Sequence, residues 1–226
     1  MQPQDAPTAF LFKLWPWVEA NRVRLLAGTG IVLVAVFLYF FFTYQREQNE
    51  INAGLAMTQL GLAMPTDAGA GQWADSYSKI VNDFSGTAAA RRAQLQGAGA
   101  MFDTGRYPEA QAQFQKFLDT HPDSELSASA ALGVAACLEA LGKADLALGA
   151  YQRVTIGFPG NLVAVNAAKL ALARLSIQQG KLADAANFYE SILRAVPGGP
   201  LAQEAEMCLI DVRTKLVLSQ PAAVKP

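Results

Sequence analysis

The chain has 226 residues, a formal net charge of −1, and only two cysteines and one histidine. Its length suits one compact domain. The near-neutral charge argues against nucleic acid as a partner, and the scarcity of Cys and His argues against a disulfide framework or a metal site.

The N-terminal region carries a long uncharged stretch. No charged residue lies between Arg24 and Arg46, and the run from Ile31 to Phe42 is apolar on every face. Twenty-one residues of helix measure about 31 Å, which matches a bilayer's hydrocarbon core. These features predict a transmembrane helix over residues 25–45. Aromatic residues typical of a membrane interface lie near its two ends: Trp15 and Trp17, then Tyr39 and Tyr44.

Two other interpretations of this stretch remain open. A cleaved signal peptide would have a shorter apolar region and small residues at a cleavage site, whereas this segment ends in Phe-Phe-Phe-Thr-Tyr-Gln-Arg. A core helix of a folded domain would not usually lack polar residues for so long. A true span, serving also as an anchor in the lipid bilayer, is the favoured hypothesis.

Flanking charge predicts the orientation. Lys13, Arg22 and Arg24 precede the span, and only Arg46 follows it closely. The positive-inside rule therefore places residues 1–24 in the cytoplasm and the rest on the exterior side. Residues 9–20 would form a short segment in the headgroup region or simply anchor the span.

The rest of the chain contains one pattern three times. A Gly is followed by a small residue after five positions, an aromatic after nine and a Pro after seventeen, with offsets of 37 and 38 residues between copies. A period of this size is typical of helical solenoids, which bind partners through a surface. The copies are Gly105, Ala110, Phe114 and Pro122; Gly142, Ala147, Tyr151 and Pro159; Gly180, Ala185, Tyr189 and Pro197.

Each copy predicts two antiparallel helices. In the second copy these cover about Ser127–Leu141 (helix A) and Lys143–Phe158 (helix B). Gly142 fits the turn because it lacks a Cβ, and Pro159 ends helix B because it has no N–H to donate.

Shorter elements complete the predicted domain. A degenerate copy with Trp73 and Tyr77 precedes the others, its helix A covering about Glu47–Ala63 and its loop Met64–Gly71. A helix over Leu201–Leu218 would cap the solenoid, because terminal repeats need a cover. The domain thus covers residues 46–219, and residues 220–226 form a frayed tail.

These residues resemble the tetratricopeptide repeat, whose order of Gly, Ala, aromatic and Pro matches from about Arg91 to Pro197. The large residue that often opens helix A is absent, since Gln94, Ala131 and Lys169 hold that position. The expected fold is therefore all-α: one transmembrane helix, then a solenoid of three full repeats, one degenerate repeat and a capping helix.

The whole arrangement resembles a narrower family. A short basic segment with Asn21, a single span and exported repeats look like the YfgM family of ancillary SecYEG translocon subunits. That resemblance implies the inner membrane, a periplasmic repeat domain, and translocon subunits, chaperones or envelope complex subunits as partners.

The repeat pattern also predicts a binding surface. Positions two, five, nine, twelve and thirteen of each helix A would line the concave face, a groove suited to a hydrophobic helix or extended segment. The same groove is alternatively filled by the helix from Glu47 or by the capping helix. The candidate protein-binding residues are Arg92, Leu95, Phe102, Asp103, Leu132, Glu139, Leu170, Arg174, Ile177 and Gln178.

Catalytic chemistry has little support in this sequence. His121 is interpreted as a solvated turn residue, and Cys137 and Cys208 as two buried free thiols too far apart to bond. The glycines Gly97, Gly99, Gly105 and Gly133 are interpreted as close-packing positions, because no strand or Gly-Lys-Ser/Thr accompanies them. We therefore expect no enzyme, no cofactor, no metal and no small-molecule substrate.

The function predicted from these patterns is a membrane-anchored scaffold that receives emerging chains or recruits chaperones. Tethering raises the local concentration of such a scaffold, so weak contacts suffice. The alternative is a fixed structural subunit of an envelope assembly that binds no clients.

Overall fold

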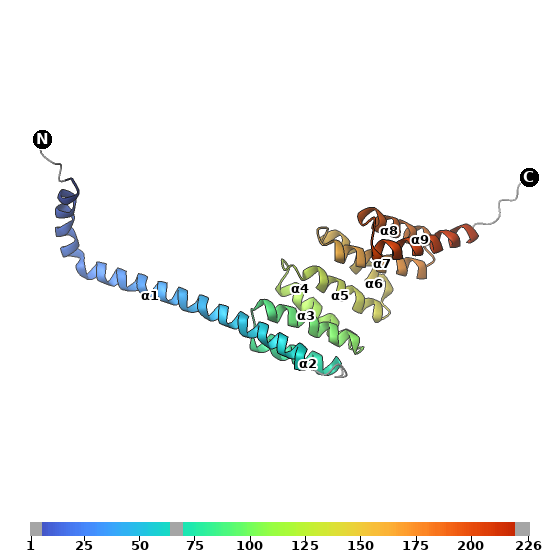
Figure 1. Cartoon of the computed structure of the whole chain (residues 1–226), viewed down its shortest axis with the longest axis horizontal. Coiled ribbons are helices and arrows are strands. Elements are labelled where there is room, and N and C mark those ends of the chain that lie inside the picture. The colour runs from blue at the N-terminus through green and yellow to red at the C-terminus, as the bar shows by residue number, and fades with distance from the viewer. Residues whose placement is uncertain (1–5, 64–69, 220–226) are drawn as a thin grey trace, which may run out of the picture. The chain divides into compact units, whose positions relative to one another are not determined.

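The computed structural model describes residues 6–63 and 70–219, which form nine α-helices and no strand (Figure 1). The chain divides into two units, one ending at Asn52 and the other beginning at Ala53. The predicted all-helical architecture with an apolar N-terminal helix and a repeat solenoid is confirmed. The tail predicted at 220–226 and most of the loop predicted at 64–71 lie outside the described residues.

Helix α1 covers Ala6–Ala63 in one piece of 58 residues. Residues 9–20, predicted either to lie in the headgroup region or to anchor the span, belong to this same helix, and so does the helix A predicted from Glu47. One reason is that residues 31–53 contain neither Gly nor Pro, so the backbone hydrogen bonds run on unbroken.

The apolar part of α1 is bare of protein contact in the described structure. Phe37 is 68% exposed and Leu33 is 63% exposed, and none of its most apolar window is buried. The helix is long and apolar enough to cross a membrane, as judged from length and composition. Burying such a surface in lipid rather than leaving it in water is the physically favourable outcome.

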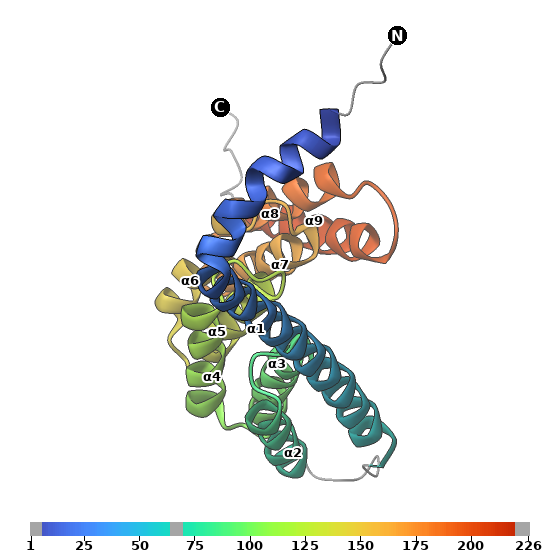
Figure 2. The same cartoon turned by 90° about the vertical axis from the view of Figure 1, so that its left-hand side faces the viewer.

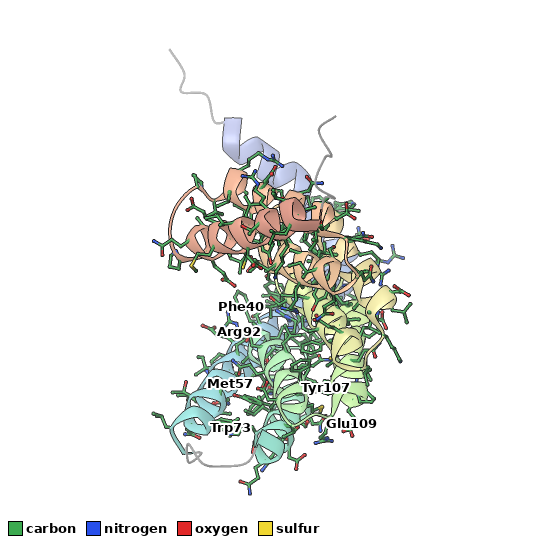
Figure 3. The ribbon with its side chains drawn as sticks, turned by 90° about the vertical axis from the view of Figure 1, so that its right-hand side faces the viewer. Phe40, Met57, Trp73, Arg92, Tyr107 and Glu109 are labelled. Carbon is green, nitrogen blue, oxygen red and sulfur yellow. The ribbon has the colours of Figure 1, made fainter. Side chains whose placement is uncertain are left out.

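The second unit begins with the last turns of α1. Ala53 is fully buried, and Met57 of α1 and Trp73 of α2 are both half-buried (Figure 3). The eight following helices are α2 (Ala70–Asp83), α3 (Ala88–Asp103), α4 (Tyr107–Thr120), α5 (Ser127–Ala140), α6 (Ala144–Gly157), α7 (Leu162–Gln178), α8 (Leu182–Ala195) and α9 (Pro200–Ser219).

Each helix from α2 to α9 packs against the next, and the hairpins stack in chain order (Figures 1 and 2). In addition, α3 contacts α5 and α5 contacts α7. The helices A therefore form a common layer, with each helix B packed between two of them. The predicted bounds in the second repeat and the cap are correct to within one residue.

The three turn glycines adopt the backbone conformation that their position predicts. Gly105, Gly142 and Gly180 have φ of +76°, +72° and +73°, a region that side chains with a Cβ rarely enter. The N–H after each glycine donates to a carbonyl five residues earlier, as in Lys143 to Leu138 at 2.9 Å. This capping closes helix A and turns the chain into helix B.

The repeated side chains make the core. Ala110, Ala147 and Ala185 are completely buried, so their small size lets helix B approach helix A closely. The aromatics at the ninth position are buried as well. Two clusters result, one built mostly from α3 to α7 and a smaller one from α7 to α9.

Candidate protein-binding surface

The candidate residues lie on the layer of helices A, but they differ in accessibility. Arg92, Asp103, Arg174 and Gln178 are exposed. The apolar members and Glu139 are half-buried: Leu95, Phe102, Leu132, Leu170, Ile177 and Glu139. The polar members are therefore the ones fully open to a partner.

The apolar candidates also belong to the packing of the domain. Leu95, Phe102 and Leu132 pack against the larger core cluster, while Leu170 and Ile177 pack against the smaller one. The Phe102 ring contacts the Tyr107 ring edge-on, with centroids 5.1 Å apart. We call these five side chains the apolar stripe. A partner would contact only their exposed parts, because the rest of each side chain packs against the core and stabilises the hairpins.

Glu139 and Arg174 are bound to each other. The Arg174 guanidinium donates from Nε at 3.1 Å and from Nη2 at 2.8 Å to Oε1 of Glu139, and from Nη2 at 2.9 Å to Oε2. The Tyr151 hydroxyl donates to Oε2 at 2.8 Å. Since Glu139 lies on α5 and Arg174 on α7, this network joins the second repeat to the third.

The environment of Tyr151 follows from this network. Its ring is 3% exposed, and burial together with the hydrogen bond to Glu139 raises its pKa. The charges of Glu139 and Arg174, both candidates for partner binding, are therefore paired with each other within the domain. Arg92 and Asp103 form no ion pair within the described part of the chain.

A cavity that sequence reasoning missed lies between the start of α3 and the loop that joins α4 to α5. Its volume is about 530 Å³. Arg92 lies at this end of α3, whereas Tyr107 lies at the other end, where α4 begins (Figure 3). The charged and titratable residues that line it are Arg91, Arg92, His121, Asp123 and Glu125. The signal in the sequence that could have indicated this cavity is the pair Arg91-Arg92 near the start of α3.

His121 is more enclosed than a solvated turn residue. It is half-buried, and its ring contacts the Phe117 ring with centroids 5.2 Å apart. Its backbone carbonyl accepts a hydrogen bond from Ser127 Oγ at 2.6 Å. His121 thus helps to fix the loop between the first two full repeats.

The glycines behave in two ways. A Cβ at Gly133 would lie 2.7 Å from three ring carbons of Phe114, and one at Gly97 would lie 3.1 Å from Tyr77 Cβ. Close packing is confirmed at both positions. Gly99 and Gly105 differ, since a Cβ at either position would meet nothing within 4 Å. The close-packing interpretation is therefore wrong for Gly99 and Gly105, and Gly105 serves only the turn.

The cysteines are both free, and Cys137 is buried as expected. Burial raises the pKa of the Cys137 thiol to about 11. Cys208 is half-buried rather than buried, which corrects that part of the prediction. Among the described residues, no three His, Cys, Asp or Glu side chains are grouped as metal ligands would be.

Comparison with known families identifies the class of protein. Residues 16–158 match the model of a tetratricopeptide repeat-like domain, and residues 164–200 match a tetratricopeptide repeat. The chain therefore belongs to the tetratricopeptide repeat-like family, whose domains act as protein–protein interaction scaffolds. No catalytic family is indicated. A comparison with curated proteins finds no significant match.

Proposed function

We propose that this protein is a scaffold anchored in the inner membrane by residues 25–45, with residues 46–219 on the exterior side and residues 1–24 in the cytoplasm. The observation that carries this proposal is α1 itself. Its most apolar stretch contains no buried residue, and its last turns already belong to the repeat domain. The basic residues before the span support the orientation.

The proposed work of the repeat domain is to hold protein chains next to a translocon, as the resemblance to the YfgM family suggests. Clients or chaperones would bind the layer of helices A through the accessible charges of Arg92 and Asp103 and the amide of Gln178. The half-buried Leu95, Leu132, Leu170 and Ile177 would supply apolar contact. Glu139 and Arg174 would shape this surface through their mutual ion pair.

A fixed structural subunit is the second candidate function. It is favoured by the packing of the apolar stripe against the core, because side chains that are fixed in this way cannot rearrange to fit unrelated clients. Such a subunit would have one partner and a large permanent interface.

The two functions are separated by photo-crosslinking in intact cells. One crosslinker replaces Phe37, which is 68% exposed in the span, and another replaces the exposed Asp103. The control position is Gln115, which is exposed on α4, a helix B. Phe102 is a poorer site, because its ring packs on Tyr107 and the core.

We expect translocon subunits from Phe37, and several exported proteins or chaperones from Asp103 but not from Gln115. One stoichiometric partner from both sites would instead establish the structural subunit. Adducts of Asp103 that contain only this protein would contradict client binding. The topology is tested separately: protease added to spheroplasts should digest residues 46–219 and spare residues 1–24.

A further inference from the structure

A second cavity lies on the side of the helices B, between α6 and α8. Both helices pack on α7, and the cavity between them has a volume of about 310 Å³. Ser176 of α7 lines it between the two helices, while Gln152 of α6 and Asn187 of α8 line it from either side. Three consecutive helices therefore contribute a polar side chain to one space.

The residue on α7 is small and polar where the other repeats have a large apolar one. Ser176 lies four residues before its turn glycine, as Met101 and Leu138 do before theirs. The carbonyl at this position accepts a hydrogen bond from the N–H after the glycine in all three repeats, so the three residues are structurally equivalent. Since Ser is much shorter than Leu or Met, it leaves space open. The corresponding cavity beside Met101 is smaller, about 210 Å³.

The Ser176 hydroxyl has no partner within the domain. The residue is 4% exposed, yet its hydroxyl makes no hydrogen bond to any residue that the structure describes. A hydroxyl in such a place is satisfied by water or by a ligand. Because Ser176 lines the cavity, a group that enters the cavity can bind this hydroxyl.

The two walls supply groups that match a peptide bond. Gln152 and Asn187 are exposed, and neither side-chain amide is hydrogen-bonded within the described part of the chain. Each amide carries both donors and an acceptor, which complements the N–H donor and C=O acceptor of a polypeptide main chain. The half-buried Leu148 and Phe188 add apolar contact beside them.

The remaining lining favours an uncharged chain over an ion or a saccharide. Lys181 and Asp184 contribute one charge of each sign, so the lining has no net charge. The Phe188 ring packs against both core clusters, which leaves little of its face for stacking on a sugar ring. An extended peptide needs no such platform, because its main chain supplies the hydrogen bonds.

We propose that the cavity between α6 and α8 binds an extended polypeptide segment through its main chain, without selecting its side chains. The walls cover one helical turn each, about 6 Å, which matches about two residues of extended chain. Contact of this size is weak, as suits transient binding of unrelated chains. This inference rests on the proposed function in taking protein chains as ligands, but the site is separate from the layer of helices A.

Nuclear magnetic resonance of the full chain in detergent tests this site. The probe is the peptide acetyl-Ser-Ala-Ser-Ala-amide, whose blocked ends carry no charge. We expect saturable shifts of the side-chain amide signals of Gln152 and Asn187. The same peptide with every main-chain nitrogen methylated should cause none, because it has no main-chain N–H to donate. Equal shifts with the methylated peptide, shifts with chitotriose alone, or no shifts at all would overturn the proposal.

Variants at the floor and at one wall separate the cavity from the rest of the domain. Ser176→Leu installs the residue that the second repeat has at this position, so it should keep the helical circular dichroism spectrum and abolish binding. Ser176→Ala keeps the space but removes the hydroxyl, and should weaken binding about 2- to 12-fold. Gln152→Leu should also weaken binding, as measured from the Asn187 signal. Its control is Gln115→Leu, at the corresponding exposed position of α4, which should not. Unchanged binding in a folded Ser176→Leu variant would refute the site.

This inference and the proposed function fail separately. If clients crosslink at Asp103 in cells while the peptide leaves the signals of Gln152 and Asn187 unshifted, only the cavity is refuted. If the peptide binds the cavity while Asp103 yields no client adducts, the cavity stands and the layer of helices A is refuted as the client surface.

Discussion

At the scale of single residues, the contrast between Gly133 and Gly99 isolates the effect of close packing. Both glycines lie in the interior of a helix A. Only Gly133 faces a side chain that would clash with a Cβ, namely the Phe114 ring. In an open position, replacing Gly by Ala stabilises a helix, because Gly loses more backbone freedom on folding.

We therefore expect opposite signs from the same substitution. Gly133→Ala should lower the free energy of unfolding by about 1–3 kcal/mol through overpacking. Gly99→Ala should raise it by about 0.5–1 kcal/mol. Chemical denaturation followed by circular dichroism measures both. A stabilising effect of Gly133→Ala would contradict this expectation, because the Phe114 ring would then have to move away from the new Cβ at no energetic cost.

Buried phenol and thiol groups make stability depend on pH. The pKa of Cys137 is raised by burial to about 11, and that of Tyr189 is raised to about 12, first by burial and then by Cys208. Because these groups keep their protons more strongly in the folded state, their stabilising contribution is complete below their unfolded pKa. It is lost as the pH rises toward the folded pKa.

The expected result is a free energy of unfolding that is insensitive to these groups near neutral pH and falls from about pH 9 upward. Cys137→Ala should remove the part of the decrease between about pH 9 and pH 11. Denaturation curves measured at several pH values test this expectation. An identical decrease in the variant would exclude Cys137 as a cause.

At the scale of helices, the Glu139–Arg174 pair fixes α5 to α7. The Glu139 side chain is 21% exposed and the Arg174 side chain is 56% exposed, so solvent weakens the pair but does not remove it. Its bidentate geometry and the added Tyr151 hydroxyl favour a measurable contribution.

A double-mutant cycle with Glu139→Gln and Arg174→Met should give a coupling energy of about 0.5–1 kcal/mol, reduced by high salt. The same variants should leave crosslinking of partners at Asp103 largely intact, because the pair is engaged within the domain. A large loss of crosslinking without a loss of stability would return both residues to the binding surface.

The helical hairpins were predictable because they depend on local chemistry. Gly142 and Pro159 mark a turn and a helix end, and Ala147 and Tyr151 recur at a fixed spacing. The ion pair was not predictable, since Glu139 and Arg174 are 35 residues apart and occupy different positions of the repeat. Whether such side chains face a partner or each other depends on how consecutive repeats are wound, which the repeat pattern leaves open.

The cavity beside His121 escaped prediction for a related reason. It is formed by the start of α3 and by the loop that joins the α3–α4 hairpin to α5, and the distance between these two segments depends on tertiary packing. Likewise, the sequence could not distinguish Gly133 from Gly99, because the distance to Phe114 is set by the neighbouring helix.

At the scale of the whole molecule, the proposed membrane anchor is open to a direct test. Val34 and Phe37 are 58% and 68% exposed near the middle of the apolar segment. Replacing both with Arg should raise the apparent free energy of insertion by about 6 kcal/mol and prevent spanning.

A glycosylation-mapping insertion assay measures this effect. The control is the double variant of Leu55→Arg and Leu62→Arg, at positions 54% and 83% exposed beyond the proposed span. It should insert like the unchanged chain. Equal insertion of both double variants would contradict a span at residues 25–45.

The division of the core into two clusters has a consequence for local opening. The smaller cluster is formed by α7, α8 and α9, and the Glu139–Arg174 pair holds α7 to the larger one. Since α8 and α9 pack on less apolar surface, they should open together while α7 stays in place. Amide hydrogen exchange followed by mass spectrometry should then show faster exchange in α8 and α9 than in α5.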